Sequence, residues 1–212
     1  YEYYRNKLLT PVEVNGKWMM NGIEVDLNPL EKIITSLKTG LNPRKNFVLN
    51  PPNATNYYIT VRELNGKDIT IYDKTDKVDD EALILINNRS NLEKGDVLFS
   101  GTGTIGRTAL VKEKPANWNI KEGVYTIKPV KSKVISKFLI FTLNSQYTKK
   151  QVNDKTVGSP VCSIPMAELK KISIPLPPLS EQERIVAILD KFNALVNDIS
   201  AGLPAEIEAR RK

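Results

Sequence analysis

The clearest hydrophobic pattern lies near the C-terminal end, where apolar residues recur at steps of three and four. The stripe comprises Ile185, Ile188, Leu189, Phe192, Leu195, Val196 and Ile199. This spacing predicts a helix over 176–199 with a narrow seam of the coiled-coil type. Pro177 and Pro178 end the preceding segment, and Ser180 and Glu183 have the spacing of a capping box. An ordinary amphipathic helix packed on its own domain fits equally well, because fewer than three heptads are present.

Both ends of the sequence carry incomplete helix signals. Gly202 and Pro204 predict that the long helix stops there, and 205–212 then begins a second helix without a stop signal. Residues 1–9 have the pattern of a last helical turn, ended by Thr10 and Pro11, but no start signal. We therefore expect a repeating unit that is cut inside a helical hairpin, either within a longer parent chain or in a subunit that pairs with a copy of itself.

Short alternating patterns between these ends predict strands. Asn15-Gly16 and Asn21-Gly22 are typical of tight turns between antiparallel strands over 12–25. Asn28 and Pro29 predict a short helix through Leu37, ended by Gly40. A loop is expected over 41–56. The strand predicted next, over 57–64, places Tyr58, Thr60 and Arg62 on one exposed face.

A glycine-rich stretch over 92–111 predicts a hairpin. Gly101, Gly103 and Gly106 match the dinucleotide-binding fingerprint in spacing only, because β-branched residues over 105–111 predict a strand where that fingerprint needs a helix. Glycines at a hairpin tip allow close approach of the backbone to another molecule, although a turn that simply needs glycine explains them equally well. The polar and cationic side chains at this tip are Ser100, Thr102, Thr104 and Arg107.

The remaining patterns complete an α+β domain. They predict a strand over 123–128, a helix over 134–146 and an edge strand over 171–176. The polar segment 147–159 has the donors that phosphates and base edges require, or is a solvated helix end. The predicted fold is a mixed, mostly antiparallel sheet domain with a long C-terminal helix of the coiled-coil type and a helical-hairpin start.

Composition argues against several classes of enzyme. The chain has no histidine and a single cysteine, Cys162, which excludes Ser-His-Asp and Cys-His catalysis, nearly every zinc site and an internal disulfide. Residues 50–53 (NPPN) resemble the N-P-P-aromatic motif of DNA methyltransferases, but Asn53 cannot stack on a flipped base. We expect no catalytic residue and no metal site. The longest apolar run, 82–86, is too short to span a membrane, so a cytoplasmic protein is expected.

The net charge of +7 is unevenly distributed. Residues 181–199 contain four acidic and two basic side chains, whereas 131–155 contains six lysines and one acidic residue. A basic domain joined to a non-basic helix predicts that the domain meets a polyanion and the helix meets protein. A lysine-rich surface without any ligand is the competing explanation.

Three stretches together resemble a known family. They are GDVLFSGTGTIGRTALV over 95–111, MAELKKISIPLPPLSEQERIVAILDKF over 166–192 and EIEARRK over 206–212, with YEYYRNKLL at the start. Their order and spacing closely resemble the specificity (S) subunits of type I restriction and modification systems, across essentially the whole chain. In that family, target-recognition domains alternate with conserved helical regions that pair antiparallel as a spacer between the two halves of a DNA site.

The resemblance implies three regions in this sequence. Residues 1–10 correspond to the end of a conserved helical region, 11–176 to one target-recognition domain and 177–212 to the next helical spacer. The family usually has two recognition domains, so a single one fits either a fragment or a half-subunit.

The resemblance also implies sequence-specific binding of double-stranded DNA, with no catalysis and no cofactor in this chain. S-adenosylmethionine, ATP and Mg²⁺ are expected on separate modification and restriction subunits, which are the expected protein partners. A second copy of the domain, in the same parent chain or as a homodimer, is expected to pair through the conserved helices. The alternatives are an assembly module that bridges subunits without reading DNA, and an enzyme whose active residues are not recognisable.

Two groups of residues are the candidates for these contacts. Those expected to contact DNA are Arg44, Lys45, Tyr58, Arg62, Thr102, Thr104, Arg107, Lys149, Lys150 and Lys155. Those expected to bury against a second conserved helix are Ile185, Leu189, Phe192, Val196 and Ile199.

Overall fold

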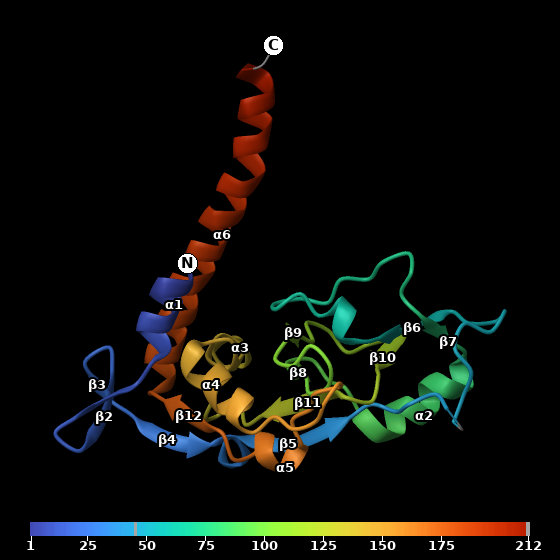
Figure 1. Cartoon of the computed structure of the whole chain (residues 1–212), viewed down its shortest axis with the longest axis horizontal. Helices are drawn as coiled ribbons and strands as arrows, with labels where there is room; N and C mark the ends of the chain where they lie inside the picture. Colours follow the sequence, from blue (N-terminus) through green and yellow to red (C-terminus); the bar gives the residue numbers. More distant parts are fainter. Residues whose placement is uncertain (45, 211–212) are drawn as a thin grey trace.

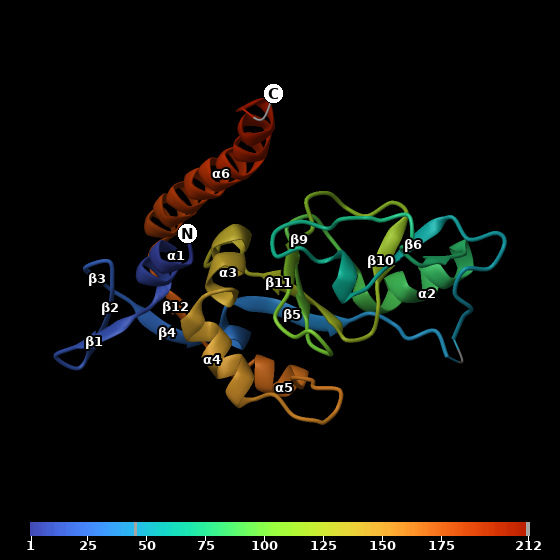
Figure 2. The same ribbon diagram turned by 45° about the horizontal axis from the view of Figure 1, so that its top comes forward.

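The computed structural model shows an α+β domain from which one long helix projects (Figures 1 and 2). It describes the backbone of residues 1–44 and 46–210, and the side chains of residues 1–44 and 46–196. The long helix is α6 (Leu179–Arg210), and the short N-terminal helix α1 (Glu2–Leu9) lies beside its first turns. The predicted fold class is confirmed.

A small antiparallel arm follows α1. It consists of β1 (Val12–Val14), β2 (Lys17–Met20) and β3 (Ile23–Glu24). At its first turn, Asn15 and Gly16 have φ values of 52° and 76°, the left-handed conformation that a type I′ turn requires. Asn21 and Gly22 repeat this geometry at the second turn. The two predicted hairpin turns are therefore confirmed.

The central sheet is antiparallel and has the order β5-β11-β8-β9. Its strands are β5 (Ile34–Thr39), β11 (Val124–Pro129), β8 (Val97–Ser100) and β9 (Thr108–Leu110). Strands β8 and β9 are the two arms of the predicted glycine hairpin, and β11 is the strand predicted over 123–128. Helix α3 (Ser136–Leu143), also predicted, packs on β8 and β9 through apolar side chains such as the fully buried Phe138.

The helix predicted over 28–37 is wrong. Strand β4 (Asp26–Pro29) pairs with the predicted edge strand β12 (Ser173–Leu176), and only a 3₁₀ turn, η1 (Leu30–Lys32), separates β4 from β5. The β-branched residues at the start of β5 favour a strand, and pairing with β11 satisfies its backbone. The helix signals at Asn28 and Pro29 are therefore overridden by tertiary pairing.

A second sheet lies beside the first and contains one parallel pair. Its strands are β6 (Asn56–Ile59), β7 (Lys77–Val78) and β10 (Trp118–Ile120), with β10 parallel to β6 and β7 antiparallel to it. Gly40 lies where β5 meets this sheet. A Cβ atom there would be 1.8 Å from the carbonyl oxygen of Ile120, so Gly40 serves a close backbone approach and not the helix stop that we expected.

The strand predicted over 57–64 is shorter than expected. It ends with β6 at Ile59 and is followed by a 3₁₀ turn, η2 (Val61–Glu63). Helix α2 (Asp80–Ser90), which the sequence patterns did not predict, covers the second sheet (Figure 1). The expected loop joins β5 to β6. Most of the polar segment 147–159 forms helix α4 (Gln146–Asp154), and the short helix α5 (Met166–Leu169) precedes β12.

Helix α6 differs from its prediction at both ends. It begins at Leu179, so Ser180 is its second residue and not its N-cap. The predicted stop near Gly202 and Pro204 is wrong, because α6 continues to Arg210. One proline removes a single backbone hydrogen bond and one glycine weakens a helix only modestly, so neither residue obliges a long helix to end.

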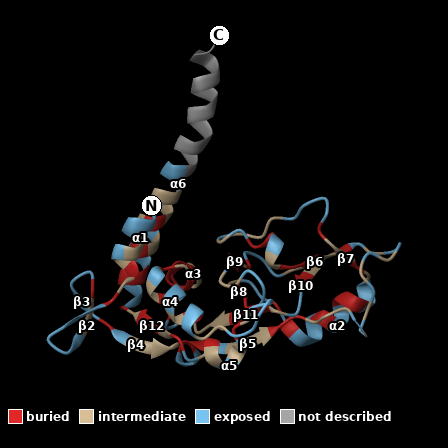
Figure 3. Cartoon of the chain, viewed as in Figure 1, coloured by how far each residue is buried: buried red, intermediate tan, exposed pale blue. Residues whose placement is uncertain are grey.

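The predicted seam on α6 is divided between two partners. Ile185 and Leu189 are fully buried in the core of the domain, in one cluster with Leu9 of α1, and their burial against a second spacer helix stays a prediction. The part of α6 next to the domain includes buried residues (Figure 3). Phe192 instead stacks on Tyr4 of α1, with ring centroids 5.2 Å apart. Val196 is 43% exposed. The side chain of Ile199 lies outside the described residues.

A buried polar joint connects α6 to the domain. Gln182 is fully buried, and its amide nitrogen donates to the carbonyl oxygens of Lys133 and Pro177, each at 2.9 Å. Its amide oxygen accepts a hydrogen bond from the backbone nitrogen of Ile135, the residue that precedes α3, at 2.9 Å. Lys137 of α3 adds an ion pair with Asp190 of α6 at 2.7 Å. The orientation of α6 is therefore set by specific contacts and not by hydrophobic packing alone.

Glu181, next to Gln182, completes the joint and makes it sensitive to pH. Its carboxylate accepts two hydrogen bonds from Arg184, at 2.6 and 2.8 Å, and one from Asn21 of the β-arm at 3.2 Å. The hydrogen bonds from Arg184 hold the pKa of Glu181 below its usual range. A lowered folded-state pKa contributes stability above the unfolded value of 4.5 and loses it as the pH falls through the folded value.

A Glu181→Gln variant is therefore expected to be less stable than the wild type at neutral pH, with a difference that shrinks as the pH is lowered below about 4.5. Urea unfolding at a series of pH values measures this difference. The exposed neighbour Glu183 gives the control variant Glu183→Gln, for which no such convergence is expected. A difference that stays constant down to pH ~3 would contradict a stabilising role for the Glu181 carboxylate.

Candidate nucleic-acid interface

Two hollows indent the surface between the segment 60–66 and the tip of the glycine hairpin. The first, here the Arg62 hollow, has a volume of about 400 Å³ and is lined by residues that include Thr60, Arg62, Asp76, Thr102, Lys121 and Glu122. The second, here the Arg107 hollow, has a volume of about 410 Å³ and is lined by residues that include Leu64, Asn65, Ile105, Arg107, Asn144 and Lys149. Both hollows border the segment 60–66 and the glycine hairpin, and we treat them together as the candidate surface.

The hairpin tip is rigidly built. Gly103 and Gly106 have φ values of 77° and 88°, which side chains other than glycine rarely adopt. The buried Ser100 hydroxyl donates to the carbonyl oxygen of Thr104 at 2.6 Å and accepts from the backbone nitrogen of Arg107 at 2.8 Å. Ser100 therefore stabilises the conformation of the tip through two internal hydrogen bonds. Thr104 and its neighbour Thr102 remain exposed.

A second segment holds the tip from the side. The backbone nitrogen of Gly103 donates to the carbonyl oxygen of Cys162, and that of Ile164 donates to the carbonyl oxygen of Gly101, each at 2.9 Å. The Tyr125 hydroxyl donates to the carbonyl oxygen of Ile164 at 2.8 Å. These bonds join the hairpin to the segment 162–164 and support its conformation.

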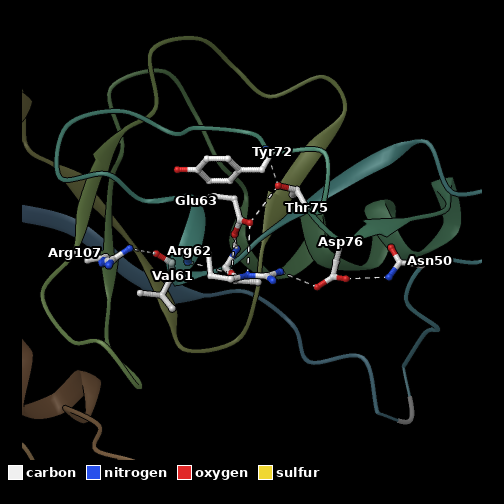
Figure 4. A network of polar contacts seen from close by, with 9 residues as sticks. Asn50, Val61, Arg62, Glu63, Tyr72, Thr75, Asp76 and Arg107 are labelled. Carbon is white, nitrogen blue, oxygen red and sulfur yellow. Dashed lines mark hydrogen bonds and ion pairs between the residues drawn. The ribbon is translucent and has the colours of Figure 1, made fainter. Parts of the chain in front are cut away.

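Arg62 belongs to a polar network that Figure 4 shows from close by. Its Nη2 atom is 3.2 Å from a carboxylate oxygen of Asp76, and its Nε atom donates to the Thr60 hydroxyl at 3.4 Å. The other Asp76 oxygen accepts from the amide nitrogen of Asn50 at 2.9 Å. Arg62 is thus exposed but held in place at two of its nitrogen atoms.

The turn that carries Arg62 is organised by a buried carboxylate, Glu63, which is 1% exposed. One of its oxygens accepts from the backbone nitrogen and the hydroxyl of Thr60, at 2.8 and 2.7 Å, which completes a capping box around η2. The other accepts from the Thr75 hydroxyl at 3.2 Å. Thr75 in turn accepts from the backbone nitrogen of Tyr72 at 3.0 Å. Glu63 therefore ties η2 to the segment that carries Asp76 (Figure 4).

The two hollows differ in charge. In the Arg62 hollow, Arg62 and Lys121 face the carboxylates of Asp76 and Glu122. In the Arg107 hollow, Arg107 and Lys149 are the charged lining residues, and both are cationic. Arg107 also donates to the carbonyl oxygen of Val61 at 3.4 Å, which bridges the hairpin to η2. The Arg107 hollow is therefore suited to an anion, whereas the Arg62 hollow is electrically balanced.

Several predicted DNA contacts fall elsewhere. Tyr58 is 1% exposed and its hydroxyl donates to the carbonyl oxygen of Leu41 at 2.6 Å, so its predicted exposure is wrong. Burial raises the pKa of the Tyr58 phenol well above its usual range. The alternation that seemed to expose Tyr58 fails because β6 is covered on both faces. Lys155 ends α4 and pairs with Glu168 at 3.3 Å, so it is engaged within the fold.

The other predicted cations lie outside the two hollows. Lys150 is exposed on α4 beside Lys149, and Arg44 is exposed on the loop between β5 and β6. Lys45 lies outside the described residues. Of the ten DNA candidates, the structure gathers four around the hollows: Arg62, Thr102, Arg107 and Lys149.

Sequence patterns missed Lys121, Asn144 and the acidic partner Asp76. Lys121 and Asn144 are single polar residues between strands or helices, with no spacing that distinguishes them. Asn50 gave a signal that we attributed to a methyltransferase-like motif. In the structure its side chain binds Asp76, and its amide oxygen accepts from the backbone nitrogen of Lys77 at 2.8 Å, so the residue anchors the loop before β6.

The described part of the chain has neither a metal-binding cluster nor a membrane-spanning helix. Among the described residues, no group of three or more His, Cys, Asp or Glu side chains is placed to hold a metal ion. Over the same part of the chain, no helix is both long and apolar enough to cross a membrane.

Comparison with known families identifies the chain. Residues 28–209 match the family model of the type I restriction modification DNA specificity domain, and this range includes both hollows and the joint to α6. The chain belongs to this family. The resemblance noted from the sequence is therefore confirmed, together with the α+β class.

Curated relatives of this specificity domain are longer proteins. A type I restriction enzyme specificity subunit of Escherichia coli is 28% identical over 216 residues, which cover 100% of this chain and 49% of the relative. A putative type I restriction enzyme specificity subunit of Haemophilus influenzae is 37% identical over 120 residues, which cover 57% of this chain and 30% of the relative. The chain thus spans half or less of the length of these relatives.

Solved structures share the fold of this specificity domain. The S subunit of a type I restriction-modification system from M. genitalium superposes with a TM-score of 0.59 at 16% identity, over 96% of this chain and 47% of that one. The HsdS subunit from Thermoanaerobacter tengcongensis superposes with a TM-score of 0.61 at 20% identity, over 95% and 44%. At these identities the comparison supports the architecture alone.

Proposed function

We propose that this specificity domain recognises a sequence in double-stranded DNA through the surface formed by the Arg62 and Arg107 hollows. The observation that carries the proposal is the convergence of two segments distant in sequence on one surface with exposed cations and threonines. Hydroxyl and guanidinium groups are donors to base edges and phosphates. Arg107 and Lys149, which form no ion pair within the described residues, suit a phosphate at the Arg107 hollow. The exposed hairpin tip between the hollows is the element best placed to enter the major groove.

The domain acts in this proposal as a binding component, without bond-making of its own. Methylation and cleavage belong to separate modification and restriction subunits, which carry S-adenosylmethionine, ATP and Mg²⁺. Helices α1 and α6 provide the contact to those subunits and to a second recognition half. That half lies in the same parent chain or in a second copy, which is in line with relatives named as specificity subunits that are about twice as long or longer.

The cations of the Arg107 hollow provide the direct test. The double variant Arg107→Ala/Lys149→Ala is expected to bind DNA on the order of thirtyfold more weakly near physiological salt, and the slope of log K against log [salt] is expected to fall by about 2. Fluorescence anisotropy with labelled duplexes at several salt concentrations measures both quantities. The loss should be similar for matched and unmatched sequences, since phosphates carry no sequence information.

A matched control removes two lysines from the helical side of the molecule. Lys7 of α1 and Lys191 of α6 are exposed. The variant Lys7→Ala/Lys191→Ala has the same change in net charge, and its salt slope is expected to stay within about 0.5 of the wild type. Equal losses in the two double variants would show that overall charge, and not this surface, governs binding. A wild type without salt-dependent binding would favour a pure assembly module.

A further inference from the structure

We infer that Arg62 reads a base and that Asp76 is the positioning residue that prevents Arg62 from serving as a phosphate contact. The inference rests on the proposed function and assigns a division of labour to its two hollows: the Arg107 hollow contacts phosphate, and the Arg62 hollow discriminates sequence. It is carried by the Asn50–Asp76–Arg62 chain of contacts (Figure 4).

Asp76 is held in place by hydrogen bonds to the domain, so it stays fixed when Arg62 contacts another molecule. Its backbone oxygen accepts from the nitrogen of Tyr58 in β6 at 2.7 Å, and one side-chain oxygen accepts from Asn50 at 2.9 Å. Two hydrogen bonds to the backbone of Lys77 fix Asn50. The backbone nitrogen of Asn50 donates to the carbonyl oxygen of Lys77, and the amide oxygen of Asn50 accepts from the backbone nitrogen of Lys77, each at 2.8 Å. The remaining oxygen of Asp76 meets Arg62 at 3.2 Å. A pair in which one member is immobile holds the other member in a defined orientation.

The same contacts leave one end of the guanidinium available. Nη2 donates one hydrogen to Asp76. Nε is 3.4 Å from the Thr60 hydroxyl and 3.8 Å from the Glu63 carboxylate. Within the described residues, Nη1 meets no acceptor. Nη1 and the second hydrogen of Nη2 therefore form a free fork on a side chain that is 56% exposed. A fork of two parallel donors matches the two acceptors, O6 and N7, that guanine presents in the major groove.

Charge decides between a base and a phosphate as the ligand of this fork. The carboxylates of Asp76 and Glu122 offset the charges of Arg62 and Lys121 in this hollow and repel an anion, so a phosphate gains no net attraction there. A guanine edge is neutral and meets no such penalty. The Asp76 carboxylate thus disfavours phosphate as the ligand of Arg62. A site that disfavours a competing ligand gains specificity without gaining affinity. No comparable acid lines the Arg107 hollow.

Replacement of Asp76 by asparagine should convert Arg62 into a phosphate contact. In the specificity chain assembled with its modification subunits, Asp76→Asn is expected to bind a scrambled duplex severalfold more tightly, with a salt slope steeper by about 1. The ratio of affinities for recognised and scrambled duplexes is expected to fall roughly tenfold. The recognised sequence is first obtained from the methylated motifs of the source genome. Anisotropy titrations at several salt concentrations then give the ratio and the slope together.

Two further variants separate the possible outcomes. Glu13→Gln makes the same change in charge at an exposed position of the β-arm, outside both hollows, and both quantities are expected to match the wild type. Arg62→Lys keeps the charge but loses the fork, so the ratio is expected to fall roughly tenfold at an unchanged salt slope. Because Arg62 is exposed, this variant keeps the inference testable even if Asp76→Asn does not fold.

The inference is overturned if Asp76→Asn behaves like Glu13→Gln, or if Arg62→Lys keeps the full affinity ratio, while the wild type binds DNA. A wild type that shows no salt-dependent binding overturns the proposed function instead. The two failures are therefore distinguishable in one set of titrations.

Discussion

A Gly101→Ala variant is expected to lose about 3 kcal/mol of unfolding free energy and most of its affinity for DNA. A Cβ atom at this position would lie 2.1 Å from the ring of Tyr125, far inside van der Waals contact. The ring cannot move freely, because Tyr125 is 7% exposed and its hydroxyl is bonded to Ile164. Hence the base of the hairpin would shift, and the tip that carries Thr102 and Arg107 would shift with it.

A double-mutant cycle tests this cause. The additional replacement Tyr125→Ala removes the atoms that the new methyl group would meet, so the double variant should be more stable than the sum of the two single losses predicts, by about 1 kcal/mol or more. Urea denaturation gives the four free energies. Gly103→Ala is the control, since its Cβ would meet nothing within 4 Å and only its positive φ adds a cost of about 1 kcal/mol. Additive losses at Gly101 and Tyr125 would disprove the steric explanation.

The glycine hairpin shows what local sequence signals determine well. Positive φ at Gly103 and Gly106 and the alternating strands on either side depend on neighbours in the sequence, so the hairpin was predictable. Tyr58 shows the opposite case. Its period-two pattern indicated one exposed face, but helix α2 and the loop before β6 pack on the face that carries Tyr58, and neither lies within the strand itself. No local pattern reports such coverage.

Helix α6 shows how one stripe can serve two partners. The spacing of Ile185, Leu189 and Phe192 predicted an apolar face correctly, but spacing alone does not say what covers that face. The structure divides it: the first two residues complete the core of their own domain, and Phe192 meets α1. The prediction of a helix end at Gly202 and Pro204 failed for a related reason. These residues indicate a local loss of helix stability, but they do not indicate whether a long helix tolerates that loss.

The candidate site was predictable in its residue types and not in its grouping. Arg62, Thr102, Arg107 and Lys149 were among ten candidates chosen because they are polar, cationic or on loops. Their convergence on two hollows results from the packing of η2 against the hairpin, where Val61 and Arg107 are in contact although they are 46 residues apart in sequence. Asp76 lay outside every predicted motif, because its ion pair with Arg62 is recognised only when the positions of both residues in space are known.

The joint at Gln182 gives the second large effect. A Gln182→Glu variant is expected to lose about 4 kcal/mol of unfolding free energy, although the side chain keeps its shape. The glutamate oxygen that replaces the amide nitrogen cannot donate to the carbonyl oxygens of Lys133 and Pro177, and a fully buried charge would face both of them. Urea denaturation of the variant and of the exposed control Glu183→Gln measures the difference, and equal stability would contradict the assigned hydrogen bonds.

The same variant connects stability to the geometry of recognition. Gln182 joins the start of α3, which packs on the strands of the hairpin, to the first turn of α6. In the proposed function the spacer helices set the distance between two recognition halves. Loosening this joint should then change that distance before it alters base recognition within one half. Gln182→Glu is therefore expected to tolerate DNA sites with altered spacing while it keeps its preference within each half-site. Loss of preference within the half-site at unchanged spacing would show that the joint supports the reading surface instead.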